Sequence, residues 1–223
     1  MPFQPPQIER LALPGPAGEL QAVVEIPPGR DPGYPDPGHF AVVCHPHPLH
    51  GGTLDNKVVH TLARAFEELG AAAIRFNFRG VGTSAGQYDE GLGETDDALA
   101  VIEYGRRRWP QARLWLAGFS FGGAVAIRAA ASAHPERVVA ISPAVMRLDR
   151  LDVSGTRTRS CPWLIVQGDA DEVLDAKTVL QWADRLSPPP VVNVMAGASH
   201  FFHGRLGELR DGVLAFMRDV TLR

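Results

Sequence analysis

The chain has 223 residues, of which 45% are hydrophobic and 21% charged, a mixture typical of a globular protein with a sizeable core. Its 22 basic and 25 acidic residues give a formal net charge of −3, which argues against binding to nucleic acid or to an anionic membrane. The longest uncharged stretch near the middle is too short to span a bilayer. We therefore expect a small-molecule substrate, with no nucleic acid and no membrane as partner.

The N-terminus and the cysteines indicate the compartment. The first residues lack the basic start and apolar run of a secretory signal, which predicts a cytoplasmic location. Cys44 and Cys161 each lie beside an apolar run, where reduced, buried thiols are the ordinary expectation and a disulfide is not. The oligomeric state does not follow from these features.

The predicted elements begin with an edge hairpin, because apolar residues partly alternate over 8–13 and 20–26. Residues 40–44 form a continuous apolar run, typical of a strand buried on both faces. After that, the spacing of apolar residues alternates between the period of a helix and that of a strand. This predicts helices at 54–69, 94–108, 122–133, 176–186 and 206–220. It predicts strands at 71–78, 114–119, 138–141, 163–166 and 191–195.

Strands that alternate with helices of this length imply right-handed crossovers. The fold class is therefore α/β, with a mostly parallel sheet of about eight strands and helices on both faces. We predict one domain over residues 1–223. In such sheets ligands bind at the carboxyl ends of the strands, so residues that follow strands are the candidates for a site.

A candidate nucleophile lies between a predicted strand and a predicted helix, in the sequence Gly118-Phe119-Ser120-Phe121-Gly122. A strand that enters a helix without a loop forces its middle residue into a strained conformation and leaves no room for large flanking side chains. Gly118 and Gly122 meet that demand, so the segment reads as a G-x-S-x-G nucleophile elbow. The turn would expose Ser120 Oγ and bring the Phe121 N–H to a helix N-terminus, where it can stabilise an oxyanion.

A serine nucleophile needs a base, and the base needs an orienting carboxylate. Two aspartates, Asp169 and Asp171, and two histidines, His200 and His203, follow later strands. Either choice gives the chain order Ser, Asp, His. We predict His200 as the base in preference to His203, because it comes first after its strand. We predict Asp171 as the carboxylate in preference to Asp169, whose side chain is expected to bond the N–H groups of its own loop.

The segment His45–Thr53 follows the first predicted parallel strand, from which such enzymes draw their second oxyanion N–H. Its two prolines have no N–H to donate, which leaves His47, and further out Leu49, as donors. We choose His47. The histidines of this segment lack the nearby carboxylates of common metallohydrolase patterns, so we expect no metal and no other cofactor.

Five motifs occur in this order between Cys44 and Phe202: C-H-P-H-P-L-H-G-G-T, R-F-N-F-R-G-V-G-T-S, G-F-S-F-G-G, Q-G-D-A-D and A-G-A-S-H-F-F. Together they resemble the small bacterial α/β-hydrolases related to dienelactone hydrolase and acylaminoacyl-peptidase catalytic domains. The resemblance spans most of the chain and implies an eight-stranded α/β-hydrolase fold and hydrolysis of an ester or related acyl bond. The residues at the triad positions are Ser120, Asp171 and His200, and those at the oxyanion positions are His47 and Phe121. Dienelactone hydrolase has cysteine as its nucleophile, so its particular activity is not implied.

Two alternatives come from other classes of protein. Gly80–Ala85 fits the dinucleotide fingerprint G-x-G-x-x-G/A after a strand, as in an NAD-binding oxidoreductase. That fingerprint should open a helix at once, but residues typical of a loop follow it here. The second alternative is a catalytically inactive binding protein with an α/β-hydrolase-like fold.

The connection after the strand at 138–141 decides whether a lid covers the site, because covering domains are commonly inserted there. Residues 146–160 are too few for a separate helical cap, so we expect no lid domain and an open site that prefers short acyl chains. The connection contains several arginines, which suit either a solvated basic loop or a substrate that carries a carboxylate. They are Arg147, Arg150, Arg157 and Arg159.

Overall fold

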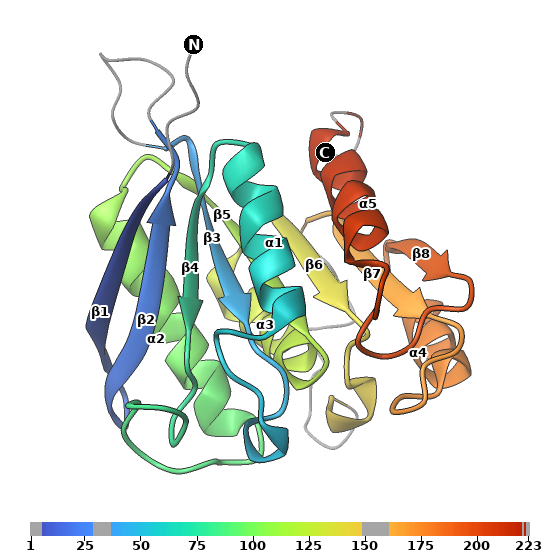
Figure 1. The fold of residues 1–223 in the computed structure, drawn as a ribbon, viewed down its shortest axis with the longest axis horizontal. Coiled ribbons are helices and arrows are strands. Elements are labelled where there is room, and N and C mark those ends of the chain that lie inside the picture. The colour runs from blue at the N-terminus through green and yellow to red at the C-terminus, as the bar shows by residue number, and fades with distance from the viewer. Residues whose placement is uncertain (1–5, 29–36, 149–160, 220, 222–223) are drawn as a thin grey trace.

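The computed structural model describes residues 6–28, 37–148, 161–219 and 221. Its strands form one sheet in the order β1-β2-β4-β3-β5-β6-β7-β8 (Figure 1). The strands are β1 (Gln7–Gly15), β2 (Gly18–Ile26), β3 (His39–Cys44), β4 (Ala72–Phe76), β5 (Arg113–Phe119), β6 (Arg137–Ile141), β7 (Trp163–Gly168) and β8 (Val191–Met195).

The first two strands are the antiparallel part of this sheet. β1 pairs antiparallel with β2 and β2 antiparallel with β4, whereas each of the remaining neighbours pairs in parallel. The edge hairpin and the mostly parallel sheet expected from the sequence are both confirmed. The carboxyl ends of the parallel strands consequently meet at one edge of the sheet.

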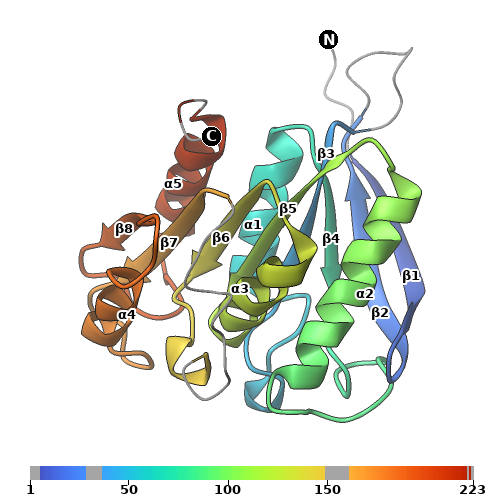
Figure 2. The ribbon, with the colours of Figure 1, turned by 180° about the vertical axis from the view of Figure 1, so that it is seen from behind.

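Helices cover both faces of the sheet, as Figures 1 and 2 show. One face carries α1 (Lys57–Glu68) and α5 (Leu206–Arg218), and the other carries α2 (Leu92–Arg108), α3 (Phe121–Ala133) and α4 (Ala176–Ala183). Each face has its own apolar core. Because successive strand residues point to opposite faces, Val42 of β3 packs in one core and Val43 in the other, which explains the continuous apolar run of this strand.

The starts and ends of the helices differ from the predicted ranges. α1 begins at Lys57, because the Asn56 side chain caps it by accepting the Val58 N–H at 2.9 Å. Leu54, predicted to open this helix, instead donates its N–H to Asn77 Oδ1 at 2.8 Å. α5 ends at Arg218, so the predicted end at position 220 lies outside the described residues.

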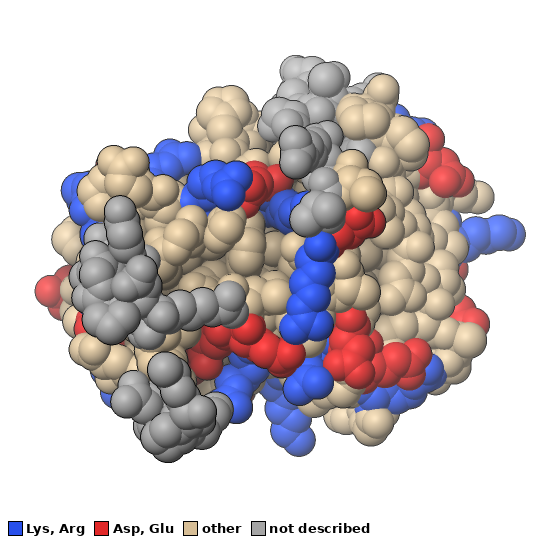
Figure 3. All heavy atoms as spheres, turned by 90° about the horizontal axis from the view of Figure 1, so that it is seen from above, with Lys and Arg blue, Asp and Glu red and all other residues tan. Residues whose placement is uncertain are grey.

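Ion pairs tie α1 to α5 at the end of the sheet opposite the carboxyl ends of the parallel strands. Glu68 lies 3.9 Å from Arg210 and 3.1 Å from Arg218. Figure 3 looks onto this end, where acidic and basic side chains alternate. Within the ranges that the structure describes, no helix combines the length and apolar character that crossing a membrane requires.

A buried cluster of charges joins β2, β4 and α1. Arg75 donates to both carboxylate oxygens of Glu25, at 3.1 and 2.9 Å, and to the carbonyl of Leu54. Glu67 faces Glu25 across this cluster. Burial, together with the negative charge of Glu25, raises the pKa of Glu67 to about 7.

We expect the substitution Glu67→Gln to reduce the loss of stability at alkaline pH. A carboxyl whose pKa rises from 4.5 to about 7 on folding favours the folded state fully below pH 4.5 and loses that contribution as the pH rises through 7. The amide does not titrate. Melting temperatures at pH 5 and pH 8 should therefore fall more for the wild type than for the variant. Equal falls in the two proteins would contradict this account of Glu67.

Candidate active site

Ser120 occupies a strained turn between β5 and α3. The strand ends at Phe119 and the helix begins at Phe121, so Ser120 alone makes the connection, with φ 55° and ψ −116°. This conformation is rare for a residue with a side chain and persists only where surrounding contacts impose it. The Ser120 N–H donates to the Ile141 carbonyl at 2.8 Å, and the Ser120 carbonyl accepts the N–H of Ala144 at 3.0 Å. The neighbouring strand β6 thus holds the turn.

The glycines on either side of Ser120 allow this turn to form. A Cβ on Gly118 would lie 2.1 Å from the Gly122 carbonyl oxygen. A Cβ on Gly122 would lie 2.3 Å from the carbonyl oxygens of Cys44 and His45. Real Cβ atoms do not approach backbone this closely, so the close packing predicted from the motif is confirmed.

Three predicted site residues form one chain of hydrogen bonds. His200 Nε2 lies 3.1 Å from Ser120 Oγ, and His200 Nδ1 lies 2.8 Å from Asp171 Oδ2. An ionised carboxylate can only accept, so Nδ1 carries the ring proton and Nε2 accepts from the serine hydroxyl. Ser120 is 8% exposed and His200 is 2% exposed. The arrangement can transfer a proton from the serine to the imidazole.

Asp171 is ionised because several donors surround it. Burial alone would raise its pKa, but the hydrogen bond from His200 and the N–H groups of Leu174 and Val173 outweigh burial and lower the pKa to about 2. Gln167 adds a fourth donor, with Nε2 at 2.9 Å from Asp171 Oδ2. The negative charge therefore persists throughout the neutral pH range.

The alternatives to Asp171 and His200 lie elsewhere. The Asp169 side chain accepts the N–H of Gly197, in the loop that carries His200, and not the N–H groups of its own loop as we predicted. The two loops pack against each other at this point, which makes the cross-loop partner the nearer one. His203 is exposed, with its ring against that of Phe201. Asp169 is thus a loop-to-loop contact, separate from the hydrogen-bond chain.

Two buried or partly buried contacts of this site were missed by sequence reasoning. The first is the bond from Gln167 to Asp171. In the second, Glu172 accepts the backbone N–H of His200 at 3.1 Å and so fixes the histidine loop. Both residues flank Asp171 within the segment Q-G-D-A-D-E. Their proximity to a predicted acid was the available signal.

The loop after β3 lies beside α3. His47 precedes the single-turn helix η1 (Pro48–His50), and its ring centroid lies 5.0 Å from that of Phe121. Phe121 is the first residue of α3, so its N–H has no acceptor one turn earlier in the helix. The assignment of the His47 and Phe121 N–H groups as oxyanion donors stays a prediction.

The other two histidines of this loop have structural surroundings. Nε2 of the buried His45 accepts the N–H of Phe78 at 3.0 Å, and its Nδ1 lies 2.7 Å from the Pro46 carbonyl. Burial lowers the pKa of His45 to about 4, so it is neutral. His50 stacks on His47. In the part of the chain that the structure describes, no three His, Cys, Asp or Glu side chains come close enough together to hold a metal ion.

The glycine loop proposed for an NAD-binding protein does not open a helix. The Gly80 N–H donates to the Ala85 carbonyl at 3.1 Å, so the loop closes on itself. α2 begins only at Leu92, where the Glu94 side chain accepts the N–H of Gly91 at 2.7 Å. A dinucleotide pyrophosphate requires the glycine loop and the helix N-terminus together, so this alternative is wrong.

Comparisons with known proteins relate the chain to serine hydrolases. A family model of serine aminopeptidases, S33, matches residues 47–157. RP471 of Rickettsia prowazekii (strain Madrid E) is 35% identical over 182 residues, which are 78% of this chain and 76% of that protein.

Solved structures extend the likeness over nearly the whole chain. An alpha-beta serine hydrolase homologue from Coxiella burnetii is 42% identical with a TM-score of 0.84, over 94% of this chain and 97% of that one. XC6422 from Xanthomonas campestris, a member of the a/b serine hydrolases without lid, is 43% identical with a TM-score of 0.86, over 98% of this chain and 97% of that one. The chain therefore belongs to the family of small bacterial α/β serine hydrolases. It has the α/β-hydrolase fold that its motifs implied.

The connection after β6 contains one turn of helix, η2 (Val145–Arg147), in its described part. Residues 149–160, on which the expectation of a lid-free site partly rested, lie outside the described residues. Arg150, Arg157 and Arg159 lie in the same segment. Arg147 is therefore the arginine of this connection whose surroundings the structure describes.

We expect Asp171→Asn to reduce turnover far more than Asp169→Asn. Asparagine has no negative charge, so at position 171 it would no longer keep the imidazole proton of His200 on Nδ1. Loss of the correct tautomer lowers kcat by on the order of a thousandfold or more. Asp169→Asn removes only a contact between loops. Steady-state rates on an activated aryl ester would compare the two variants, and the reverse ranking would move the assignment to Asp169.

Proposed function

We propose that the protein is a serine hydrolase that cleaves small carboxylic esters through an acyl-enzyme on Ser120. The observation that carries the proposal is the hydrogen-bonded series Ser120 Oγ, His200 Nε2, His200 Nδ1 and Asp171 Oδ2, at 3.1 and 2.8 Å. Membership of the α/β serine hydrolase family supports it.

In the acylation step, Ser120 Oγ attacks the ester carbonyl while His200 Nε2 takes the hydroxyl proton. The imidazolium that forms is stabilised by Asp171, which stays ionised because its pKa is about 2. The carbonyl oxygen gains negative charge and is stabilised by the N–H groups of Phe121 and His47. His200 then gives its proton to the leaving alcohol, and the acyl group stays on Ser120.

Deacylation repeats these steps with water as the nucleophile. His200 takes a proton from the water, whose oxygen attacks the acyl carbon, and returns it to Ser120 Oγ as the carboxylic acid leaves. Every proton in the cycle passes through Nε2 of His200. No metal and no other cofactor takes part in this mechanism.

The substitution Ser120→Ala tests the proposal directly. We expect it to lower kcat/KM for a p-nitrophenyl ester by on the order of a thousandfold or more, because the nucleophile acts as a unit with its base. The far-ultraviolet circular dichroism should stay that of the wild type, and EDTA should leave wild-type turnover unchanged. A variant that kept most of its activity would mean that hydrolysis does not use Ser120, and an inactive wild type would favour a binding protein; either outcome would sink the proposal.

The length of the acyl chain gives a second test. A site without a covering domain offers little apolar wall to a long chain, so rates on p-nitrophenyl esters should peak at short acyl chains. Lipid interfaces should give no activation. A rate maximum at long chains, or a jump in rate above the micelle concentration of the substrate, would contradict the lid-free description.

A further inference from the structure

A cationic side chain lies next to the proposed oxyanion donors and takes no part in the mechanism above. The guanidinium of Arg147, at the end of η2, lies 5.3 Å from the centroid of the Phe121 ring. Its Nη2 lies 2.8 Å from His47 Nε2, and its Nη1 donates to Tyr88 Oη at 2.9 Å. Arg147 thus touches the side chains of both residues whose N–H groups would hold the oxyanion.

The position of Arg147 is fixed by its surroundings. A guanidinium can only donate, so Nε2 of His47 accepts its bond and the imidazole is neutral. Burial, and then the positive charge of Arg147, lower the pKa of His47 to about 4. The rings of His47, Tyr88 and Phe121 contact one another at centroid distances of 5.0 to 5.9 Å, and the guanidinium lies over the ring of Phe121.

Two arginines lie near this site, and the carboxylates that act on them are the buried Glu94, near Arg128, and Glu90, near Arg147. Arg128 of α3 donates to the Arg147 carbonyl at 3.3 Å and to the Gly91 carbonyl at 2.6 Å, and in the described ranges it forms no ion pair with a carboxylate. Arg147 has Glu90 at 3.8 Å, but the Glu90 side chain is 77% exposed. An exposed pair at this distance contributes little, so an incoming anion can replace Glu90.

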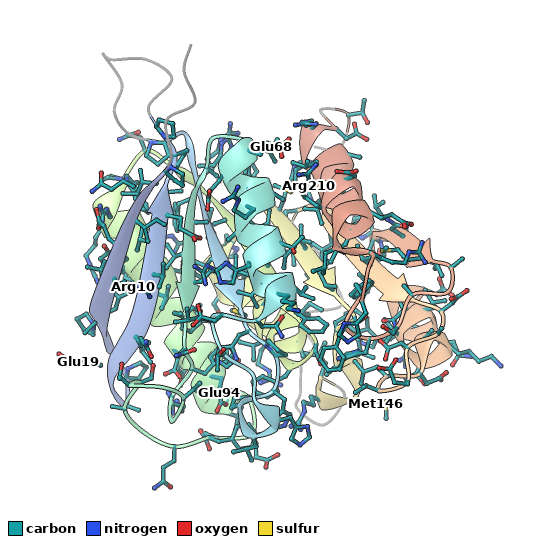
Figure 4. The ribbon with its side chains drawn as sticks, viewed as in Figure 1. Arg10, Glu19, Glu68, Glu94, Met146 and Arg210 are labelled. Carbon is teal, nitrogen blue, oxygen red and sulfur yellow. The ribbon has the colours of Figure 1, made fainter. Side chains whose placement is uncertain are left out.

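Arg147 is also accessible to a bound molecule. Its side chain is 33% exposed, and its guanidinium keeps N–H groups beyond those given to His47 and Tyr88. Figure 4 shows its neighbour Met146 at the end of the molecule where the parallel strands finish. Met146 is 59% exposed there.

The side of the site on which Arg147 lies indicates which part of a substrate it meets. His200, which must protonate the leaving alcohol, contacts the rings of Phe119 and Phe201. Arg147 contacts two different rings, those of Phe121 and His47. The leaving group belongs beside His200, so the acyl chain is the part that extends toward Arg147.

We propose that Arg147 binds a carboxylate at the far end of the acyl chain, so that the preferred substrates are half-esters of short dicarboxylic acids. This inference rests on the proposed ester hydrolysis and names its substrate class. Carboxylate and guanidinium form short, charge-assisted and bidentate hydrogen bonds, which supply both binding energy and orientation. In the structure, the carboxylate that lies near the Arg147 guanidinium is that of Glu90.

The test compares two ethyl esters of equal acyl length, ethyl hydrogen glutarate and ethyl pentanoate, by pH-stat at constant ionic strength. The wild type should prefer the half-ester in kcat/KM. Arg147→Gln should lower the ratio of half-ester to neutral ester by roughly tenfold or more, mainly through KM, because a hydrogen bond to a charged group is lost. Arg147→Lys should keep part of the preference.

Two further variants sharpen this comparison. Glu90→Gln removes the competing carboxylate and should raise the same ratio, in the direction opposite to Arg147→Gln. Arg210→Gln is a matched control, since Arg210 lies on α5 at the other end of the molecule (Figure 4) and should leave both rates as in the wild type. A third ester, 2-carboxyethyl pentanoate, carries its carboxylate on the leaving group.

Each adverse outcome has a distinct meaning. Equal losses on both ethyl esters in Arg147→Gln would make Arg147 a residue that positions His47 and would overturn the substrate class. A loss confined to 2-carboxyethyl pentanoate would overturn the placement on the acyl side. A wild type that hydrolyses the neutral ester without preferring the half-ester would refute the inference alone, whereas hydrolysis of neither ester would refute the proposed function as well.

Discussion

The strained turn at Ser120 is the constraint on which the rest of the site depends. Because β5 enters α3 through a single residue, the backbone around Gly118 and Gly122 packs so closely that a Cβ at either position would overlap neighbouring backbone atoms. The Gly122 position lies against the carbonyls at the end of β3, which brings the loop with His47 beside α3. The Ser120 carbonyl accepts the N–H of Ala144, which anchors η2 and Arg147. One turn therefore sets the positions of Ser120, of the loop with His47 and of Arg147.

Asp171 and His200 are held in place by a separate set of contacts between the loops after β7 and β8. Asp171 receives hydrogen bonds from Gln167, from His200 and from two backbone N–H groups, while Asp169 and Glu172 bind the backbone of the histidine loop. Three neighbouring carboxylates thus have different tasks. Only Asp171 faces the imidazole, and its many donors keep it charged without rearrangement during a reaction.

The sheet and the triad candidates were predictable from the sequence because they depend on local patterns. The strand-to-helix junction with its glycines defined Ser120, and chain order after later strands selected Asp171 and His200. Contacts between distant loops were not predictable. The Asp169 partner Gly197 and the contacts of Arg147 with His47 and Tyr88 depend on how loops fold back over the sheet, which periodicity does not encode. The start of α1 depends on one cap, Asn56, that a helical period cannot resolve.

We propose that Ser120 is a nucleophile activated by His200 and Asp171. Labelling with a fluorophosphonate, followed by peptide mapping, tests it without assuming any substrate, since only an activated serine reacts rapidly. We expect a single adduct on Ser120, formed rapidly in the wild type and far more slowly in His200→Ala. Failure of the wild type to react, or an adduct on another serine, would contradict it.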